Sequence, residues 1–153
     1  MCAIASYPRV EVAAALIRRG DRILMVYNEN WKALTLPITK RRQWVNPDNQ
    51  NDMHDEDWAD AAGRAAWEVL NKTVRFDSMP LHEIVDLEYG GRTGEWKRYH
   101  LKIFDAGIDS NDTIVDGLLV EWLGAEDILD EHRRPISPTA REVIRQLRAN
   151  KKL

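Results

Sequence analysis

The sequence has one cysteine and no long apolar run, and both shortages exclude classes of protein. Cys2 has no second cysteine with which to form an internal disulfide, so the fold must rely on a hydrophobic core. No segment approaches the roughly 20 apolar residues that span a bilayer. The first residues also lack the basic and apolar regions of a secretory signal. These absences predict a cytoplasmic protein that does not enter a membrane.

The sequence also lacks an excess of charge of one sign. It has 22 Lys and Arg against 25 Asp and Glu, a net charge of −3, which argues against general binding to nucleic acid or to anionic membranes. Its four histidines show no i, i+4 pairing and no cysteine partner, which argues against a zinc site. With 44% hydrophobic residues, residues 1–153 suit a single globular domain.

Strand patterns occur on both sides of the middle of the chain. The predicted strands cover residues 9–18, 23–27, 83–89, 96–104 and 118–123. The first two flank a turn at 19–21, and the third and fourth flank a glycine-rich turn at 90–94, so each pair predicts a hairpin. A polar segment rich in Asn and Asp, residues 46–55, predicts a long loop, within an inserted polar loop around 41–55.

Helix signals follow that loop and return near the end of the chain. Asp55 is predicted to cap a helix whose apolar stripe is Trp58, Ala62, Ala65 and Val69. A short helix is predicted at 125–131. Another opens at Ser137-Pro138, a capping residue before a proline at the first helical position. Strands, a central helix, more strands and a terminal helix predict an α+β sandwich, not a doubly wound sheet.

Within the central helix, Glu56, Arg64 and Glu68 fall at the spacing of the Nudix box, G-x5-E-x7-R-E-U-x-E-E-x-G-U, where U is a bulky aliphatic residue. The chain resembles the Nudix superfamily over nearly its whole length, including Leu36-Pro37-x-x-Lys40 before the box. The resemblance implies an α/β/α sandwich with a central mixed sheet, a box helix and a C-terminal helix.

Several box positions depart from the family pattern. Ala65 and Val69 stand where the family has glutamates, and neither side chain can ligate a metal. The opening glycine is absent, because that position holds Thr39 or, counted back from Glu56, Gln50. The closing glycine and aliphatic residue are Asn71 and Lys72; asparagine tolerates the left-handed conformation that ends helices.

The resemblance implies metal-dependent hydrolysis of nucleoside diphosphates linked to another group, with Mg²⁺ or Mn²⁺ held between carboxylates and phosphate oxygens. In an active version Glu68, with Glu56, would hold the metal, and Arg64 would belong to the helix framework. A single carboxylate on the body of the helix is a weak nucleus for such a site, because several negative charges must converge there.

A basic run at Lys40, Arg41 and Arg42, followed by Trp44, is the candidate substrate-binding segment. Arginine can bind phosphate through two hydrogen bonds, and tryptophan can stack on a base. A second basic cluster, Arg92, Lys97 and Arg98, surrounds Trp96 in the second hairpin.

The sequence thus favours a Nudix-fold protein with a degenerate box that binds a nucleotide or phosphorylated metabolite with little or no hydrolysis. An active metal-dependent hydrolase that uses non-standard acidic ligands is the alternative. A third hypothesis is an interaction domain whose apolar face at Ala65 and Val69 packs against a partner or a second subunit. A homodimer is compatible with all three.

Overall fold

The computed structural model describes residues 9–74, 76–90, 95–107, 114–132 and 135–153. The strands are β1 (Arg9–Arg19), β2 (Arg22–Asn28), β3 (Ala33–Thr35), β4 (Ile38–Lys40), β5 (Gln43–Asn46), β6 (Asn49–Asp55), β7 (His82–Gly90), β8 (Glu95–Gly107) and β9 (Val120–Gly124). The helices are α1 (Trp58–Leu70), α2 (Ala125–Leu129) and α3 (Pro138–Ala149). No helix in the described residues is long and apolar enough to cross a membrane.

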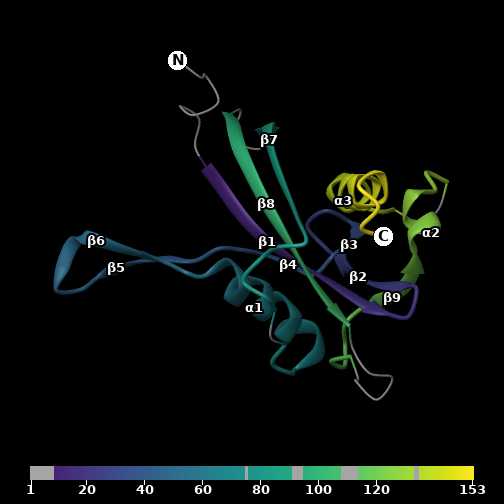
Figure 1. Ribbon diagram of the computed structural model, residues 1–153, viewed down its shortest axis with the longest axis horizontal. Coiled ribbons are helices and arrows are strands. Elements are labelled where there is room, and N and C mark those ends of the chain that lie inside the picture. The colour runs from purple at the N-terminus through teal and green to yellow at the C-terminus, as the bar shows by residue number, and fades with distance from the viewer. Residues whose placement is uncertain (1–8, 75, 91–94, 108–113, 133–134) are drawn as a thin grey trace.

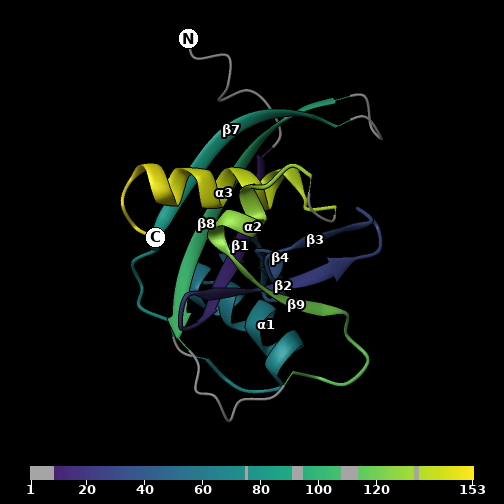
Figure 2. The same ribbon diagram turned by 90° about the vertical axis from the view of Figure 1, so that its right-hand side faces the viewer.

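Seven of the strands form one mixed sheet. Its order is β3-β2-β1-β8-β7, with β4 also paired to β1 and β9 also paired to β2. The β1–β8 pair is parallel and the other pairs are antiparallel. Helix α1 covers one face of the sheet, and α2 and α3 lie against the other (Figures 1 and 2). The predicted α+β sandwich with a central mixed sheet is confirmed.

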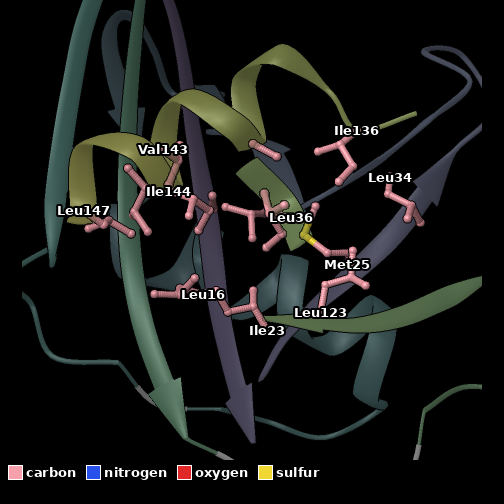
Figure 3. Close-up of a cluster of buried hydrophobic side chains, with 14 of the residues drawn as sticks. Leu16, Ile23, Met25, Leu34, Leu36, Leu123, Ile136, Val143, Ile144 and Leu147 are labelled. Atoms are coloured by element: carbon pink, nitrogen blue, oxygen red, sulfur yellow. The ribbon is translucent and has the colours of Figure 1, made fainter. Parts of the chain in front are cut away.

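Strand β1 is buried on both faces because it lies in the middle of these layers. Ala14 and Leu16 belong to the core cluster on the α3 side, where Figure 3 shows Leu16. Ala15 and Ile17 alternate with them and pack on the α1 side. A strand covered on both faces reads as a continuous apolar run, as residues 12–17 do.

Local signals correctly predicted several elements. The two hairpins form as β1–β2 and β7–β8, although residues 91–94, which include Arg92, lie outside the described part of the chain. Ser137 caps α3 by accepting a hydrogen bond from the amide of Ala140 (3.1 Å), and Pro138 begins the helix. The buried residues of α3 are Ala140, Val143, Ile144 and Leu147, as its stripe predicted.

The predicted long loop at 46–55 is wrong, because β5 and β6 pair as an antiparallel hairpin there. The predicted cap is also wrong. Asp55 ends β6, whereas Asp57 is the residue whose carboxylate accepts from the amide of Ala59 (3.3 Å), so α1 begins at Trp58. Smaller corrections are a strand that begins at Val120, not 118, and a short helix that ends at Leu129, not 131.

Candidate functional site

The ion pair between Glu56 and Arg64 connects the start of α1 to its second turn. The guanidinium Nε donates to Oε2 of Glu56 and Nη2 donates to Oε1, both at 2.8 Å. The amide of Arg42 donates to the same Oε1 (3.0 Å). The hydrogen bonds from Arg64 are the main cause that lowers the pKa of Glu56, against the opposing effect of burial. Both carboxylate oxygens are therefore engaged within the protein.

Arg64 also holds the end of β4 against the helix. Its Nη2 donates to the carbonyl oxygen of Lys40 (2.8 Å), and its Nη1 lies 3.4 Å from Oγ1 of Thr39. These contacts join β4, Glu56 and the helix through one side chain. Glu56 is buried and occupied by Arg64, so it is poorly placed to release an oxygen to a metal.

Ala65 and Val69, the two apolar replacements, are 1% and 4% exposed. Val69 packs with Ala15, Ile17 and Leu24 of the sheet. The face is thus covered by strands of the same chain, which corrects the hypothesis that it packs against a partner. Asn71 ends the helix with φ of 50°, the left-handed conformation expected for it.

A small cleft of about 150 Å³, here called the helix cleft, lies where α1 meets β2 and the segment before β4. Ala65, Glu68 and Val69 line it from the helix, and Tyr27, Asn28 and Pro37 are among the residues opposite. Glu68 is exposed and is the one carboxylate in this lining. Across the described residues, no three His, Cys, Asp or Glu side chains converge as a metal site would require. The donor set therefore does not fit a multi-metal centre.

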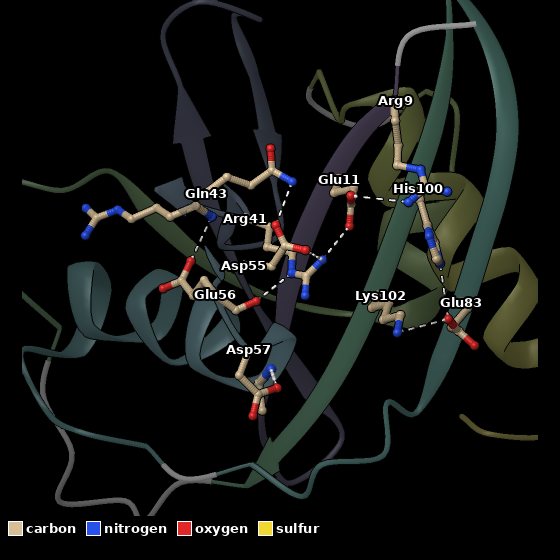
Figure 4. Close-up of polar contacts among 12 residues, drawn as sticks. Arg9, Glu11, Arg41, Gln43, Asp55, Glu56, Asp57, Glu83, His100 and Lys102 are labelled. Atoms are coloured by element: carbon tan, nitrogen blue, oxygen red, sulfur yellow. Dashed lines mark hydrogen bonds and ion pairs between the residues drawn. The ribbon is translucent and has the colours of Figure 1, made fainter. Parts of the chain in front are cut away.

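The residues of the predicted substrate segment do not converge on one point. Arg41 turns inward: Nη1 donates to Glu11 Oε2 (2.9 Å) and Nε donates to the carbonyl oxygen of Glu56 (Figure 4). Its guanidinium also lies 4.9 Å from the ring centroid of Trp58. Arg42 is exposed. Trp44 lies on β5, with its ring 6.4 Å from that of His54.

Lys40, by contrast, lines a basic pocket of about 440 Å³. Its lining comprises Arg9, Val10, Glu11, Lys40, Arg41, Gln43 and Lys97, so four cations face one carboxylate. The contribution of Arg9 was missed in the sequence, and Lys97 was noticed only as part of the second hairpin. The pairing that joins them is parallel, between β1 and β8, and connects residues far apart in sequence. A local sequence pattern cannot predict a contact between such distant residues.

Solved structures of other proteins share this architecture. The MutT protein from Methanosarcina mazei Go1 matches with a TM-score of 0.65 at 18% identity, over 97% of this chain and 99% of its own. The NUDIX domain of Shewanella oneidensis NrtR, in a cocrystal with ADP ribose, matches with a TM-score of 0.61 at 14% identity, over 98% and 93%.

A bifunctional NMN adenylyltransferase/ADP ribose pyrophosphatase from Francisella tularensis, complexed with AMP and a Mn ion, has a TM-score of 0.59 at 18% identity, over 94% of this chain and 42% of its own. The chain therefore has the fold of the Nudix superfamily. In sequence, it matches no protein-family model and no curated protein.

Proposed function

We propose that the chain binds a nucleotide or another phosphorylated small molecule and hydrolyses it slowly or not at all. The burial of Ala65 and Val69 carries this proposal. At two positions where the Nudix resemblance calls for metal-binding carboxylates, the helix has apolar side chains packed on its own sheet. The box is degenerate in this reading, and the fold is retained for binding.

The two remaining box acids support the same conclusion. Glu56 is held through both oxygens by Arg64, so its release to a metal would leave a partly buried guanidinium without its carboxylate partner. Glu68 alone is open to the helix cleft. Mg²⁺ prefers six oxygen ligands and can keep several waters, but one protein carboxylate leaves little charge to hold two metals against a diphosphate.

The basic pocket supports the binding half of the proposal. Of the predicted segment, we assign Lys40 to contact with the ligand. Arg9 and Lys97 join it from the same pocket, and Arg41 forms part of the pocket wall. Clustered cations beside a concave surface attract phosphate groups. Since the NrtR domain with the same fold was crystallised with ADP ribose, ADP ribose is the first ligand to test.

An active hydrolase with non-standard ligands remains the alternative, and one observation favours it. Glu68 is exposed and lines the helix cleft, where a metal bridged mainly by substrate could still reach it. Metal-dependent product formation that disappears in Glu68→Gln would establish this alternative and overturn our proposal.

Calorimetric titration with ADP ribose in EDTA tests the proposed binding. We expect heat of binding without metal, and a loss of affinity of about 10-fold or more in Lys40→Ala with Lys97→Ala, because charge-assisted hydrogen bonds to phosphate are removed. Arg148→Ala is the matched control, since this exposed cation pairs with Glu126 on another surface. Equal affinity in all three proteins would contradict the assignment of the pocket.

A further inference from the structure

The β5–β6 hairpin, residues 43–55, extends away from the rest of the chain (Figure 1). We call it the arm. It has only two strands, and in the described residues it forms its own sheet, separate from the seven-stranded one. Isolated two-stranded hairpins are marginally stable in water unless something packs against them. Packing against a further surface would therefore stabilise the arm.

Apolar side chains lie on both faces of the arm. Trp44 is opposite His54 and Val45 is opposite Met53. Residues directly opposite share a face and neighbouring pairs alternate, so Trp44 lies on one face and the Val45–Met53 pair on the other. Trp44 is 51% exposed and Met53 is 57% exposed. Large apolar groups on both sides of a projecting hairpin are typical of a segment that is buried in an assembly.

The charge of the arm narrows the choice of partner. Between positions 43 and 55 the sequence contains Asp48, Asp52 and Asp55 and no lysine or arginine. An acidic segment with exposed apolar groups complements a surface that is both basic and apolar, because opposite charges steer and orient association. Nucleic acid and anionic lipid are excluded as partners of the arm by the same charge.

A surface with these properties exists on the same chain. Val85 of β7 and Trp96 of β8 are 57% and 47% exposed, and the strand register places them on one face with Arg98. Among the described residues, none accepts a hydrogen bond from the shielded Nε of Arg98. Parallel pairing sets Arg9 beside Arg98, but Arg9 lies 3.7 Å from Glu11 and lines the basic pocket, so Arg98 is the cation of this surface. We call this surface the receiving face.

The receiving face is on the side of the sheet that α1 covers, but α1 begins at Trp58 and its cover of the sheet stops there. The Trp58 ring lies 5.0 Å from that of His100, two residues along β8 from Arg98. Beyond that contact the exposed fractions of Val85 and Trp96 show that the face is open. The arm and the receiving face are thus two unfilled, complementary surfaces on one polypeptide.

We propose that two copies of the chain form a dimer in which the arm of each copy docks on the receiving face of the other. In a two-fold dimer the arm and the receiving face of each copy are both covered by the other copy, as in other closed symmetric dimers. It brings the acidic arm against Arg98, and it covers Val85 and Trp96 with apolar side chains from one face of the arm.

Sedimentation equilibrium at about 50 µM, well above a micromolar dissociation constant, tests the proposal. We expect twice the 17.7 kDa mass of one chain. Trp44→Ser with Met53→Ser should raise the dissociation constant at least 10-fold. Trp31→Ser is the matched control, since Trp31 is a similarly exposed tryptophan outside the arm, and it should leave the dimer intact. Circular dichroism checks that each variant is folded.

A charge exchange makes the test specific to the two surfaces. Arg98→Glu alone, and Asp48→Lys with Asp52→Lys alone, should each weaken the dimer about 10-fold or more. Combining all three changes should restore most of the affinity, because the opposite charges then face each other again. A monomeric parent protein would overturn the proposal. So would a combined variant that dimerises no more tightly than Arg98→Glu alone or the Asp48→Lys, Asp52→Lys pair alone. The ADP ribose titration changes Lys40 and Lys97, which belong neither to the arm nor to the receiving face, so the two proposals can fail separately.

Discussion

Single residues on α1 decide what the helix cleft can hold. Ala65 and Val69, which the Nudix resemblance aligns with glutamates of the box, are both buried. Glu56 and Arg64 pair with each other, and Arg64 holds the end of β4, so this framework needs no carboxylate at position 65 or 69. The scaffold and the chemistry of a box helix therefore depend on different residues and can be lost independently.

Val69→Glu should lower the free energy of unfolding by about 1 to 3 kcal/mol, because it places a carboxylate without a partner among Ile17 and Leu24. Urea denaturation measures the change. Leu119→Glu, at a well-exposed loop position, is the control and should cost no more than about 0.5 kcal/mol. A Val69→Glu curve that overlays the parent would mean that position 69 is open to water in the cleft.

Glu56→Gln should cost about 1 to 3 kcal/mol near neutral pH, because it removes one half of a mostly buried ion pair and leaves Arg64 unneutralised. The pKa of Glu56 is lowered in the folded state, so the unfolded chain binds more protons at acidic pH and stability rises with pH. The contribution is present above the ordinary glutamate pKa of about 4.3 and is lost as the pH falls below it.

The stability difference between the parent and Glu56→Gln should therefore shrink when urea curves are repeated between about pH 7 and pH 3. Glu126→Gln, in an exposed pair with Arg148, is the control and should change stability little at either pH. A constant difference across this range would show that the cost comes from packing and not from the charge of Glu56.

At the scale of elements, the sequence predicts those that are set by local signals. Ser137 and Pro138 set the start of α3 through a cap that reaches only to Ala140, three residues away. The β1–β2 hairpin is likewise local, because Arg19 pairs with Arg22 across a short turn. The arm was missed because its Asn and Asp residues have low strand propensity. A turn signal was nevertheless present, since Pro47-Asp48 separates Trp44-Val45 from the strand that contains Met53.

The start of α1 shows a different limit. Asp55 and Asp57 are equally good caps by residue type, and the choice between them is made by distant contacts. Asp55 is held in β6 opposite Gln43, whose Nε2 donates to its carboxylate (2.7 Å), and Glu56 is held by Arg64. The helix can begin only after these two residues. The basic pocket was missed for the same reason, because Arg9 and Lys97 meet through a parallel strand pair.

At the scale of the whole molecule, the mixed sheet carries both the helix cleft and the basic pocket. We propose that the basic pocket binds phosphate and that the helix cleft holds no metal. The helix cleft lies between α1 and β2, and the basic pocket lies at the ends of β1, β4 and β8. Here the basic pocket keeps four cations, whereas the cleft keeps one carboxylate.

The purified chain should therefore turn over ADP ribose or a nucleoside triphosphate well below about 1 s⁻¹ with Mg²⁺ or Mn²⁺, the low end of typical enzymes. With Glu68 as the one cleft carboxylate, too little negative charge converges to hold metal against the developing charge on phosphate.

For the same reason millimolar Mn²⁺ should leave the melting temperature unchanged, since a ligand stabilises only the state it binds. Ala65→Glu with Val69→Glu, if it folds, is the comparison: a Mn²⁺-dependent rise in its melting temperature would place both positions at the cleft. Fast turnover by the parent chain, or a Mn²⁺-dependent rise in its own melting temperature, would mean that Glu68 suffices and that the chain is a hydrolase.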